Sequence, residues 1–260
     1  MNRLNHTLSA LRESGRSGLA TYFAAGDPDY DTCLTLLRGL AEAGADLIEL
    51  GMPFSDPIAD GAALQQAHIR ALAGGQTSQR TLDLARDLRK TDTKTPVVLM
   101  GYLNPILQYG VEAFIEDAHR AGVDGLIIVD LPVEHAPEIA SLARRYAVHL
   151  IRMSAPTSTD QRLAASLRDA SGFVYHIMLA GTTGTALPDE VSIAKGLERV
   201  RRHTATPVAA GFGVRTPEQV QLVGRHADLV IVGSRFAEVL SEEGVEATLK
   251  EVEALAEVLR

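Results

Sequence analysis

The chain contains few of the residues on which several common enzyme mechanisms depend. It has one cysteine, Cys33, so it cannot form an intramolecular disulfide, which is compatible with a reducing compartment. Its eight histidines show no close ligand spacing and give little support to a zinc-dependent aldolase or metallohydrolase. No Gly-x-Gly-x-x-Gly follows the first predicted strand, so a Rossmann dinucleotide site is not indicated. The four lysines lie outside the predicted strands, which disfavours a Schiff-base aldolase: Lys90, Lys94, Lys195 and Lys250. We therefore expect neither a cofactor nor a metal.

Positive charge and long apolar runs are also scarce. The formal net charge of -8 argues against nucleic acid as the main partner, because phosphate backbones attract basic surfaces. No apolar run approaches the roughly 18 residues of a membrane span. The N-terminal stretch lacks the continuous apolar core of a secretory signal, and Leu4, Leu8 and Leu11 instead mark one face of a short amphipathic helix. We expect a cytoplasmic protein without a membrane partner.

Short apolar runs alternate with helical patterns along the whole sequence. Such alternation is typical of βαβ units with a parallel sheet, whose strands are covered on both faces. Eight units in a chain of 260 residues favour a closed barrel over an open sheet. The predicted strands are 19–24, 46–50, 96–100, 125–129, 148–153, 173–178, 207–210 and 229–232. The predicted helices between them are 30–43, 77–90, 111–121, 133–147, 159–170, 189–203, 217–224 and 245–259. We predict an α/β fold, a single-domain (β/α)8 TIM barrel over residues 1–260 with an extra N-terminal helix.

Two carboxylates eleven residues apart are the strongest candidates for catalysis. Glu49 lies between Ile48 and Leu50 in a predicted buried strand, where the charged form is disfavoured and the pKa should rise. Asp60 lies in the following Pro/Gly/Ser-rich loop, where a carboxylate should stay ionised. Two acids whose environments separate their pKa values are suited to acid–base catalysis. The alternatives are that Glu49 is a structural carboxylate paired with an arginine and that Asp60 only forms a turn with Gly61.

Glycine-rich segments follow the last three predicted strands and favour a phosphate site. Loops after strands seven and eight of such barrels commonly bind phosphate, because glycine allows backbone N–H groups to approach an anion. Ser234 could add a hydroxyl donor. Tyr175 either points into the barrel mouth or packs in the core. The glycines could also simply form tight turns: Gly181-Thr182-Thr183-Gly184, Gly211-Phe212-Gly213 and Gly233-Ser234.

The chain closely resembles the tryptophan synthase α subunit family over essentially its whole length. The most specific match is the segment ELGMPFSDPIADG at 49–61. Shorter matches occur in order along the chain: GDP at 26–28, YLNP at 102–105, DLP at 130–132, APT at 155–157, TG at 183–184 and GFG at 211–213. The resemblance implies a lyase that cleaves indole-3-glycerol phosphate to indole and D-glyceraldehyde 3-phosphate in tryptophan biosynthesis. Glu49 would be the general acid–base, and Asp60 would hold the indole N–H.

The same resemblance implies a set of substrate contacts and a protein partner. Tyr102 would contact the substrate, and Thr183 would tie the sixth loop to Asp60 when the site closes. The phosphate would be held by Gly184, Gly213, Gly233 and Ser234. The indole ring would lie among Tyr22, Met100, Ile127, Val129, Met153, Tyr175 and Phe212. A pyridoxal-phosphate β subunit would bind near the 53–60 loop, Asn104 and Pro132 to form an α2β2 tetramer.

Four departures from the family pattern keep other functions open. Ala62 stands where proline is usual, Thr182 where valine is usual and Arg235 where a small residue is usual, and the 176–180 stretch HIMLA is less polar than in relatives. A lyase that releases free indole without a β subunit is one alternative. A phosphosugar isomerase or epimerase on the same barrel and a non-catalytic regulator are two others, and the intact Glu49 and Asp60 argue against the regulator.

Overall fold

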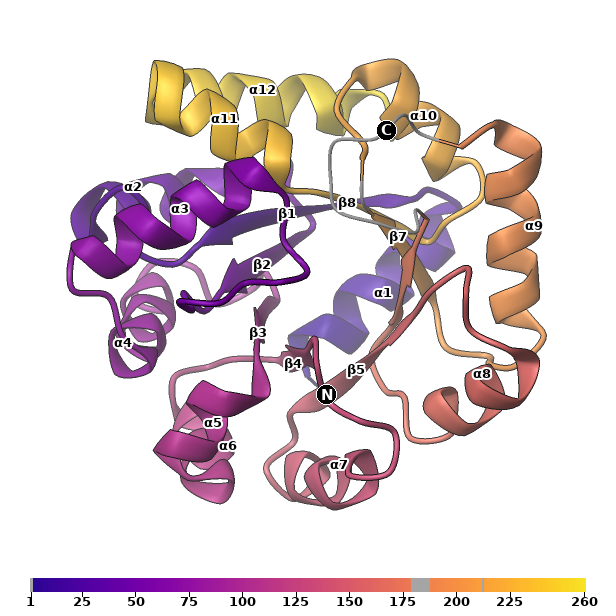
Figure 1. Ribbon diagram of the computed structural model, residues 1–260. Helices are drawn as coiled ribbons and strands as arrows, with labels where there is room; N and C mark the ends of the chain where they lie inside the picture. The colour runs from indigo at the N-terminus through magenta and orange to yellow at the C-terminus, as the bar shows by residue number, and fades with distance from the viewer. Residues whose placement is uncertain (1, 179–187, 212) are drawn as a thin grey trace.

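The chain forms a closed barrel of eight parallel strands in which each strand pairs with its neighbours in sequence and β8 closes on β1. The computed structural model describes residues 2–178, 188–211 and 213–260. Helices surround the ring of strands (Figure 1). The strands are β1 (Gly18–Ala24), β2 (Leu47–Gly51), β3 (Val97–Gly101), β4 (Gly125–Ile128), β5 (His149–Ser154), β6 (Val174–Ile177), β7 (Val208–Gly211) and β8 (Leu229–Val232). The predicted (β/α)8 barrel is thereby confirmed.

The described residues contain more helices than the alternating pattern predicts. The predicted helices correspond to α1 (Arg3–Ser14), α2 (Tyr30–Leu40), α4 (Ser78–Leu88), α6 (Val111–Arg120), α7 (Ala136–Arg145), α8 (Asp160–Leu167), α9 (Glu190–Arg201), α10 (Pro217–Gly224) and α12 (Val245–Glu257). Three more were not predicted: α3 (Ala62–Ala73), α5 (Leu103–Tyr109) and α11 (Ser234–Glu243). Each of these three follows a strand that carries site residues. None of the helices in the described part of the chain is long and apolar enough to cross a membrane.

The side chains of the strands divide into two apolar layers. Residues such as Leu50 and Phe23 point outward and pack against the helices. Alternate residues such as Leu47 and Val98 fill the barrel, because neighbouring strand positions face opposite sides. The barrel is therefore a packed core whose free space lies at its ends.

Helix α1 closes the N-terminal end of the barrel. Its three buried leucines, Leu4, Leu8 and Leu11, join the apolar cluster inside the strands. In Figure 1 this indigo helix is seen through the ring of strands. Because the N-terminal end of the barrel is closed, a substrate can approach from the carboxyl ends of the strands. The candidate residues predicted from the sequence lie at these ends.

Candidate active site

Glu49 lies in the middle of β2 and points into the barrel. It pairs in register with Tyr22 on β1 and Val98 on β3, both of which belong to the interior layer. Its side chain is fully buried, and neither carboxylate oxygen has a hydrogen-bond partner among the described residues. Burial, with a smaller contribution from the Asp60 charge, raises the pKa of Glu49 to about 8. A carboxyl group in this position is protonated at neutral pH and can donate that proton.

Asp60 lies in the loop between β2 and α3, where a turn joins its backbone N–H to the Pro57 carbonyl. The Tyr102 hydroxyl donates a hydrogen bond to Asp60 Oδ2 at 2.8 Å. Burial raises the pKa of Asp60 to about 6, and the Tyr102 hydrogen bond acts in the opposite direction. At neutral pH Asp60 is therefore mostly ionised while Glu49 is mostly protonated, as the sequence predicts for an acid–base pair. The alternative that Glu49 pairs with an arginine is wrong, since no described arginine contacts it.

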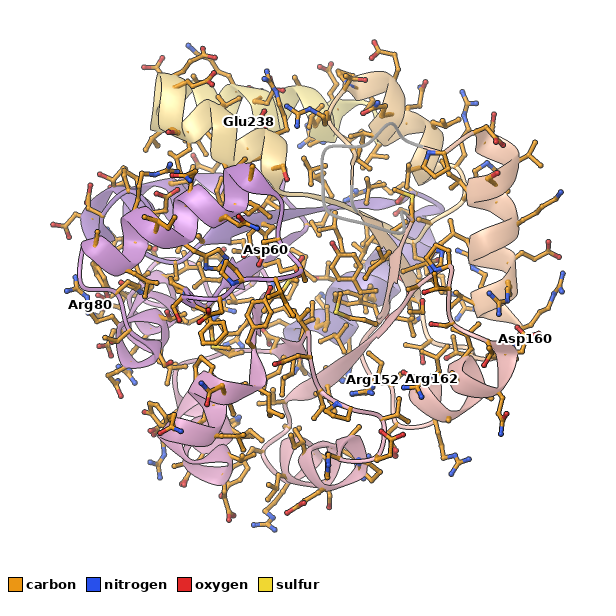
Figure 2. All side chains as sticks on the ribbon, in the orientation of Figure 1. Asp60, Arg80, Arg152, Asp160, Arg162 and Glu238 are labelled. Carbon is orange, nitrogen blue, oxygen red and sulfur yellow. The ribbon has the colours of Figure 1, made fainter. Side chains whose placement is uncertain are left out.

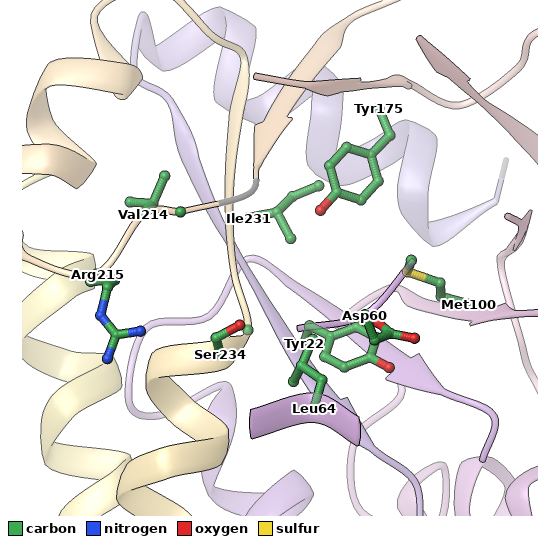
Figure 3. A pocket seen from close by; sticks show the side chains of 11 residues that line it. Tyr22, Asp60, Leu64, Met100, Tyr175, Val214, Arg215, Ile231 and Ser234 are labelled. Carbon is green, nitrogen blue, oxygen red and sulfur yellow. The ribbon is translucent and has the colours of Figure 1, made fainter. Parts of the chain in front are cut away.

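A cavity that is partly open to solvent lies at the carboxyl end of the barrel beside Asp60, and Glu49 is not among the residues that line it. In Figure 2, Asp60 lies close to the ends of the strands, whereas charged side chains such as Arg80 and Asp160 lie at the periphery. Figure 3 shows Asp60, Tyr22 and Met100 on one side of the cavity and Val214 and Ser234 on the other. The lining residues are Tyr22, Asp60, Leu64, Met100, Tyr175, Gly213, Val214, Arg215, Ile231, Gly233 and Ser234. The cavity thus combines an apolar wall with one carboxylate.

The side of the cavity opposite Asp60 is built from backbone and a helix terminus. Helix α11 begins at Ser234, and no side chain caps its first turn, so its first N–H groups lack intrahelical partners. The Ser234 Oγ atom is buried and has no partner among the described residues. Gly213 has a φ of +88°, a conformation that side chains rarely adopt. Free backbone donors, an unpaired hydroxyl and the positive end of a helix dipole together suit an anion such as a phosphate group.

The predicted substrate residues do not all reach this cavity. Six line it: Tyr22, Met100, Tyr175, Gly213, Gly233 and Ser234. Ile127 is buried among the interior side chains, and Val129 and Met153 pack against the same layer and also border a second cavity next to α8. Tyr102 acts on Asp60 and does not line the cavity. Thr183, Gly184 and Phe212 lie outside the described residues, and the roles of all these residues in binding stay predictions.

Three of the departures from the family pattern can be placed, and the first, Ala62, is the first residue of α3. The Arg235 guanidinium donates to Glu251 on α12 at 2.6 Å and is not among the residues that line the cavity, so it does not obstruct the anion site. His176 lies 3.0 Å from the Ser154 hydroxyl on the neighbouring strand and borders a different cavity beside α9. Neither of the last two changes alters the surroundings of Glu49 or Asp60. Thr182 and residues 179–180 lie outside the described part of the chain.

One buried side chain at the site escaped the sequence analysis. His68 on α3 is 2% exposed, and its Nε2 atom lies 3.6 Å from Asp60 Oδ2. The helical spacing of buried Leu64, Ala67 and Ala71 on α3 would have placed this residue on the inner face, had the helix been predicted.

Comparison with known proteins assigns the chain to a family. Residues 8–260 match the family described as tryptophan synthase alpha chain.

The chain belongs to the tryptophan synthase alpha chain family.

Solved structures of this family agree in fold over the full length. The tryptophan synthase of Mycobacterium tuberculosis is similar at a TM-score of 0.93, with 34% identity, covering 100% of this chain and 98% of the other. Tryptophan synthase subunit alpha from Legionella pneumophila str. Paris gives a TM-score of 0.92 with 34% identity over the same shares of the two chains. A structure from Aquifex aeolicus VF5 gives 0.92 and 34% identity over 100% of both chains. As a member of the tryptophan synthase alpha family, the chain is a lyase of tryptophan biosynthesis that carries out the alpha reaction.

Proposed function

We propose that the chain cleaves indole-3-glycerol phosphate to indole and D-glyceraldehyde 3-phosphate, with Glu49 and Asp60 as its acid–base pair. The observation that carries this proposal is the environment of the two carboxyl groups. One is buried without hydrogen-bond partners among the described residues and has a raised pKa, and the other is oriented by Tyr102 and stays ionised.

The reaction needs one proton to move within the substrate. Protonated Glu49 donates its proton to indole C3, which leaves a cationic indolenine ring whose N–H is held by the Asp60 carboxylate. The Glu49 carboxylate then accepts the proton of the C3′ hydroxyl as the bond between C3 and C3′ breaks. The bonding electrons return to the ring and give neutral indole, and C3′ becomes the aldehyde carbon of glyceraldehyde 3-phosphate. Glu49 ends protonated, as it began.

The shape of the cavity supports an orientation of the substrate in which the indole ring lies near Asp60. The indole ring would lie against the apolar wall near Asp60, and the phosphate would lie at Gly213, Gly233 and the start of α11. An ionised carboxylate beside an apolar wall suits a planar heterocycle with one N–H donor. A phosphosugar isomerase would share the phosphate end but has no need for that carboxylate.

We further propose that a β subunit covers the loop that leads to Asp60, to give an α2β2 assembly. Ile58 in this loop is 77% exposed, although it is large and apolar. The Phe54 ring in the same loop packs in a tilted arrangement against the Tyr102 ring, with centroids 5.2 Å apart, and Tyr102 contacts Asp60. A partner that buries Ile58 would thus act on the loop that carries the catalytic aspartate.

The decisive experiment measures indole release from indole-3-glycerol phosphate by the purified chain, with and without a tryptophan synthase β subunit. Slow cleavage that accelerates strongly with the β subunit supports both proposals. Rapid cleavage that the β subunit leaves unchanged supports the lyase activity but contradicts the assembly and favours a stand-alone enzyme. Absence of cleavage in both cases overturns the proposed reaction.

A further inference from the structure

His68 is held from both sides of its ring. The Phe54 backbone N–H donates to Nδ1 at 3.3 Å. On the other side, Nε2 lies 3.3 Å from the Tyr22 hydroxyl and 3.6 Å from Asp60 Oδ2. The imidazole ring therefore connects Phe54, near the start of the loop between β2 and α3, with Asp60 near its end. It also connects this loop with Tyr22 on strand β1.

These contacts determine where the imidazole carries its proton. Because Nδ1 accepts a hydrogen bond from a backbone N–H, it cannot itself be protonated, so the neutral ring carries its proton on Nε2. Burial lowers the pKa of His68 to about 4, and the ring is neutral throughout the physiological range. The Nε2–H group is consequently directed at the Tyr22 oxygen and Asp60 Oδ2.

This arrangement leaves the two oxygens of Asp60 in different surroundings. Oδ2 accepts the hydrogen bond of the Tyr102 hydroxyl and faces His68 Nε2. Within the described residues, Oδ1 has no hydrogen bond, and the Asp60 side chain lines the cavity. The Tyr102 hydrogen bond, with the His68 ring packed 3.6 Å from the same oxygen, restricts rotation of the carboxylate and presents the other oxygen to a ligand.

We propose that His68 is a positioning residue, which uses its Nε2–H group to fix the Asp60 carboxylate and its Nδ1 atom to tie that carboxylate to the conformation of the Phe54 loop. His68 does not line the cavity, so it acts through Asp60 and Tyr22 and exchanges no proton with the substrate. The proposal rests on the proposed function, in which Asp60 holds the indole N–H.

Three substitutions separate the two contacts of the ring. His68→Leu removes both. His68→Asn keeps an acceptor near the position of Nδ1, for the Phe54 N–H, but has no group at Nε2. His68→Gln carries an amide donor near the position of Nε2. His119→Leu, which removes an exposed histidine on α6, is the matched control.

The kinetic test compares kcat and KM of indole-3-glycerol phosphate cleavage among these variants over a range of pH. We expect His68→Leu and His68→Asn to lower kcat/KM about threefold, the scale of a weak polar contact because Nε2 lies 3.6 Å from Asp60 Oδ2, and His68→Gln to restore most of it. The ionisable groups that face His68 and Asp60 are Tyr22 from β1, Glu49 from β2, Tyr102 after β3 and Tyr175 from β6. Because Asp60 loses a nearby N–H group that favours its ionised form, the acidic limb of the pH profile should move to higher pH in His68→Leu.

Equal kinetics and pH profiles in His68→Leu and the wild type would overturn the proposal. A kcat/KM of His68→Gln no higher than that of His68→Asn would also overturn it.

A second measurement keeps this proposal separate from the proposed reaction. Titration of the Asp60 carboxyl carbon, followed by NMR of ¹³C-labelled protein, requires no turnover. An upward shift of the Asp60 pKa in His68→Leu, with no shift in His119→Leu, supports the positioning role even if the wild type fails to cleave indole-3-glycerol phosphate. If the wild type cleaves the substrate and the Asp60 titration is unchanged in His68→Leu, the role of His68 is overturned and the proposed function stands.

Discussion

The Tyr102 hydroxyl and Asp60 Oδ2 lie 2.8 Å apart, although 42 residues separate them in the sequence. The same hydroxyl accepts the Ala59 backbone N–H at 3.0 Å. Tyr102 therefore holds both the carboxylate and the backbone just before it. This single side chain from the loop after β3 fixes the end of the loop after β2.

We expect Tyr102→Phe to lower kcat/KM about tenfold near pH 7, because Asp60 loses a charge-assisted hydrogen bond. That hydrogen bond lowers the pKa of Asp60. Its loss therefore raises the pKa, and the deficit should be larger at pH 6 than at pH 8. Tyr109→Phe on α5 is the control, since the Tyr109 hydroxyl bonds to Gln79 and Asp117 and to neither Glu49 nor Asp60. A deficit of equal size at both pH values would contradict this account of Asp60.

The pH dependence of kcat/KM should be bell-shaped. The active form of the free enzyme has Asp60 ionised and Glu49 protonated, and their pKa values are about 6 and about 8. Activity should rise as pH increases through the first value and fall as it increases through the second. A profile measured from pH 5 to pH 9 checks this, and the two limbs belong to the coupled pair of carboxyl groups. Activity that continued to rise up to pH 9 would show that Glu49 is not needed in its protonated form.

Glu49→Gln preserves the shape of the side chain and removes its proton transfer. Such transfer contributes about 10²–10⁴ in rate, so kcat should fall by that factor while glycerol 3-phosphate still binds. Single-turnover formation of indole is the measurement. Near-normal turnover with an intact fold would exclude Glu49 as the acid–base group.

The same substitution should raise the stability of the protein at alkaline pH. The pKa of Glu49 is higher in the folded protein, about 8, than in the unfolded chain. The unfolded state therefore releases its proton first as pH rises from about 4.5, and the free energy of unfolding falls until pH passes about 8. The cost is on the order of a few kcal/mol and is absent in Glu49→Gln.

Urea denaturation at pH 5 and pH 8 tests this expectation. The stability advantage of Glu49→Gln over the wild type should be larger at pH 8 than at pH 5. Glu253→Gln, at an exposed position on α12, should show no such difference. If Glu49→Gln gives the same advantage at both pH values, the buried carboxyl does not have a raised pKa.

The sequence is sufficient to predict the barrel because its strands are covered on both faces and appear as apolar runs. Their predicted ends agree with the structure to within one or two residues, as at 46–50 for Leu47–Gly51. Helices α3 and α11 were missed because each begins directly after a glycine and has no side-chain cap to mark it.

The sequence could single out Glu49 and Asp60 as candidates because each is unusual in its local setting, an acid in an apolar strand and an acid in a glycine-rich loop. The partners of Asp60 could not be predicted, since contacts between Asp60 and Tyr102 or His68 depend on how distant elements pack. His68 in particular appears as an ordinary helical residue until α3 lies against β1. Contacts of this kind can be identified only from the three-dimensional structure.

The phosphate end of the cavity provides the last test. Ser234 is the first residue of α11, and its buried hydroxyl has no partner within the described residues, so Ser234→Ala should weaken glycerol 3-phosphate binding about tenfold by removing one donor to a charged group. Gly213→Val should weaken it more, because valine at a φ of +88° strains the backbone that approaches the anion. Ser241→Ala, at an exposed position near the other end of the same helix, is the matched control. Isothermal titration with glycerol 3-phosphate measures all three, and thermal unfolding reports whether Gly213→Val remains folded. Unchanged affinity in Ser234→Ala would mean that the Ser234 hydroxyl does not bind the anion.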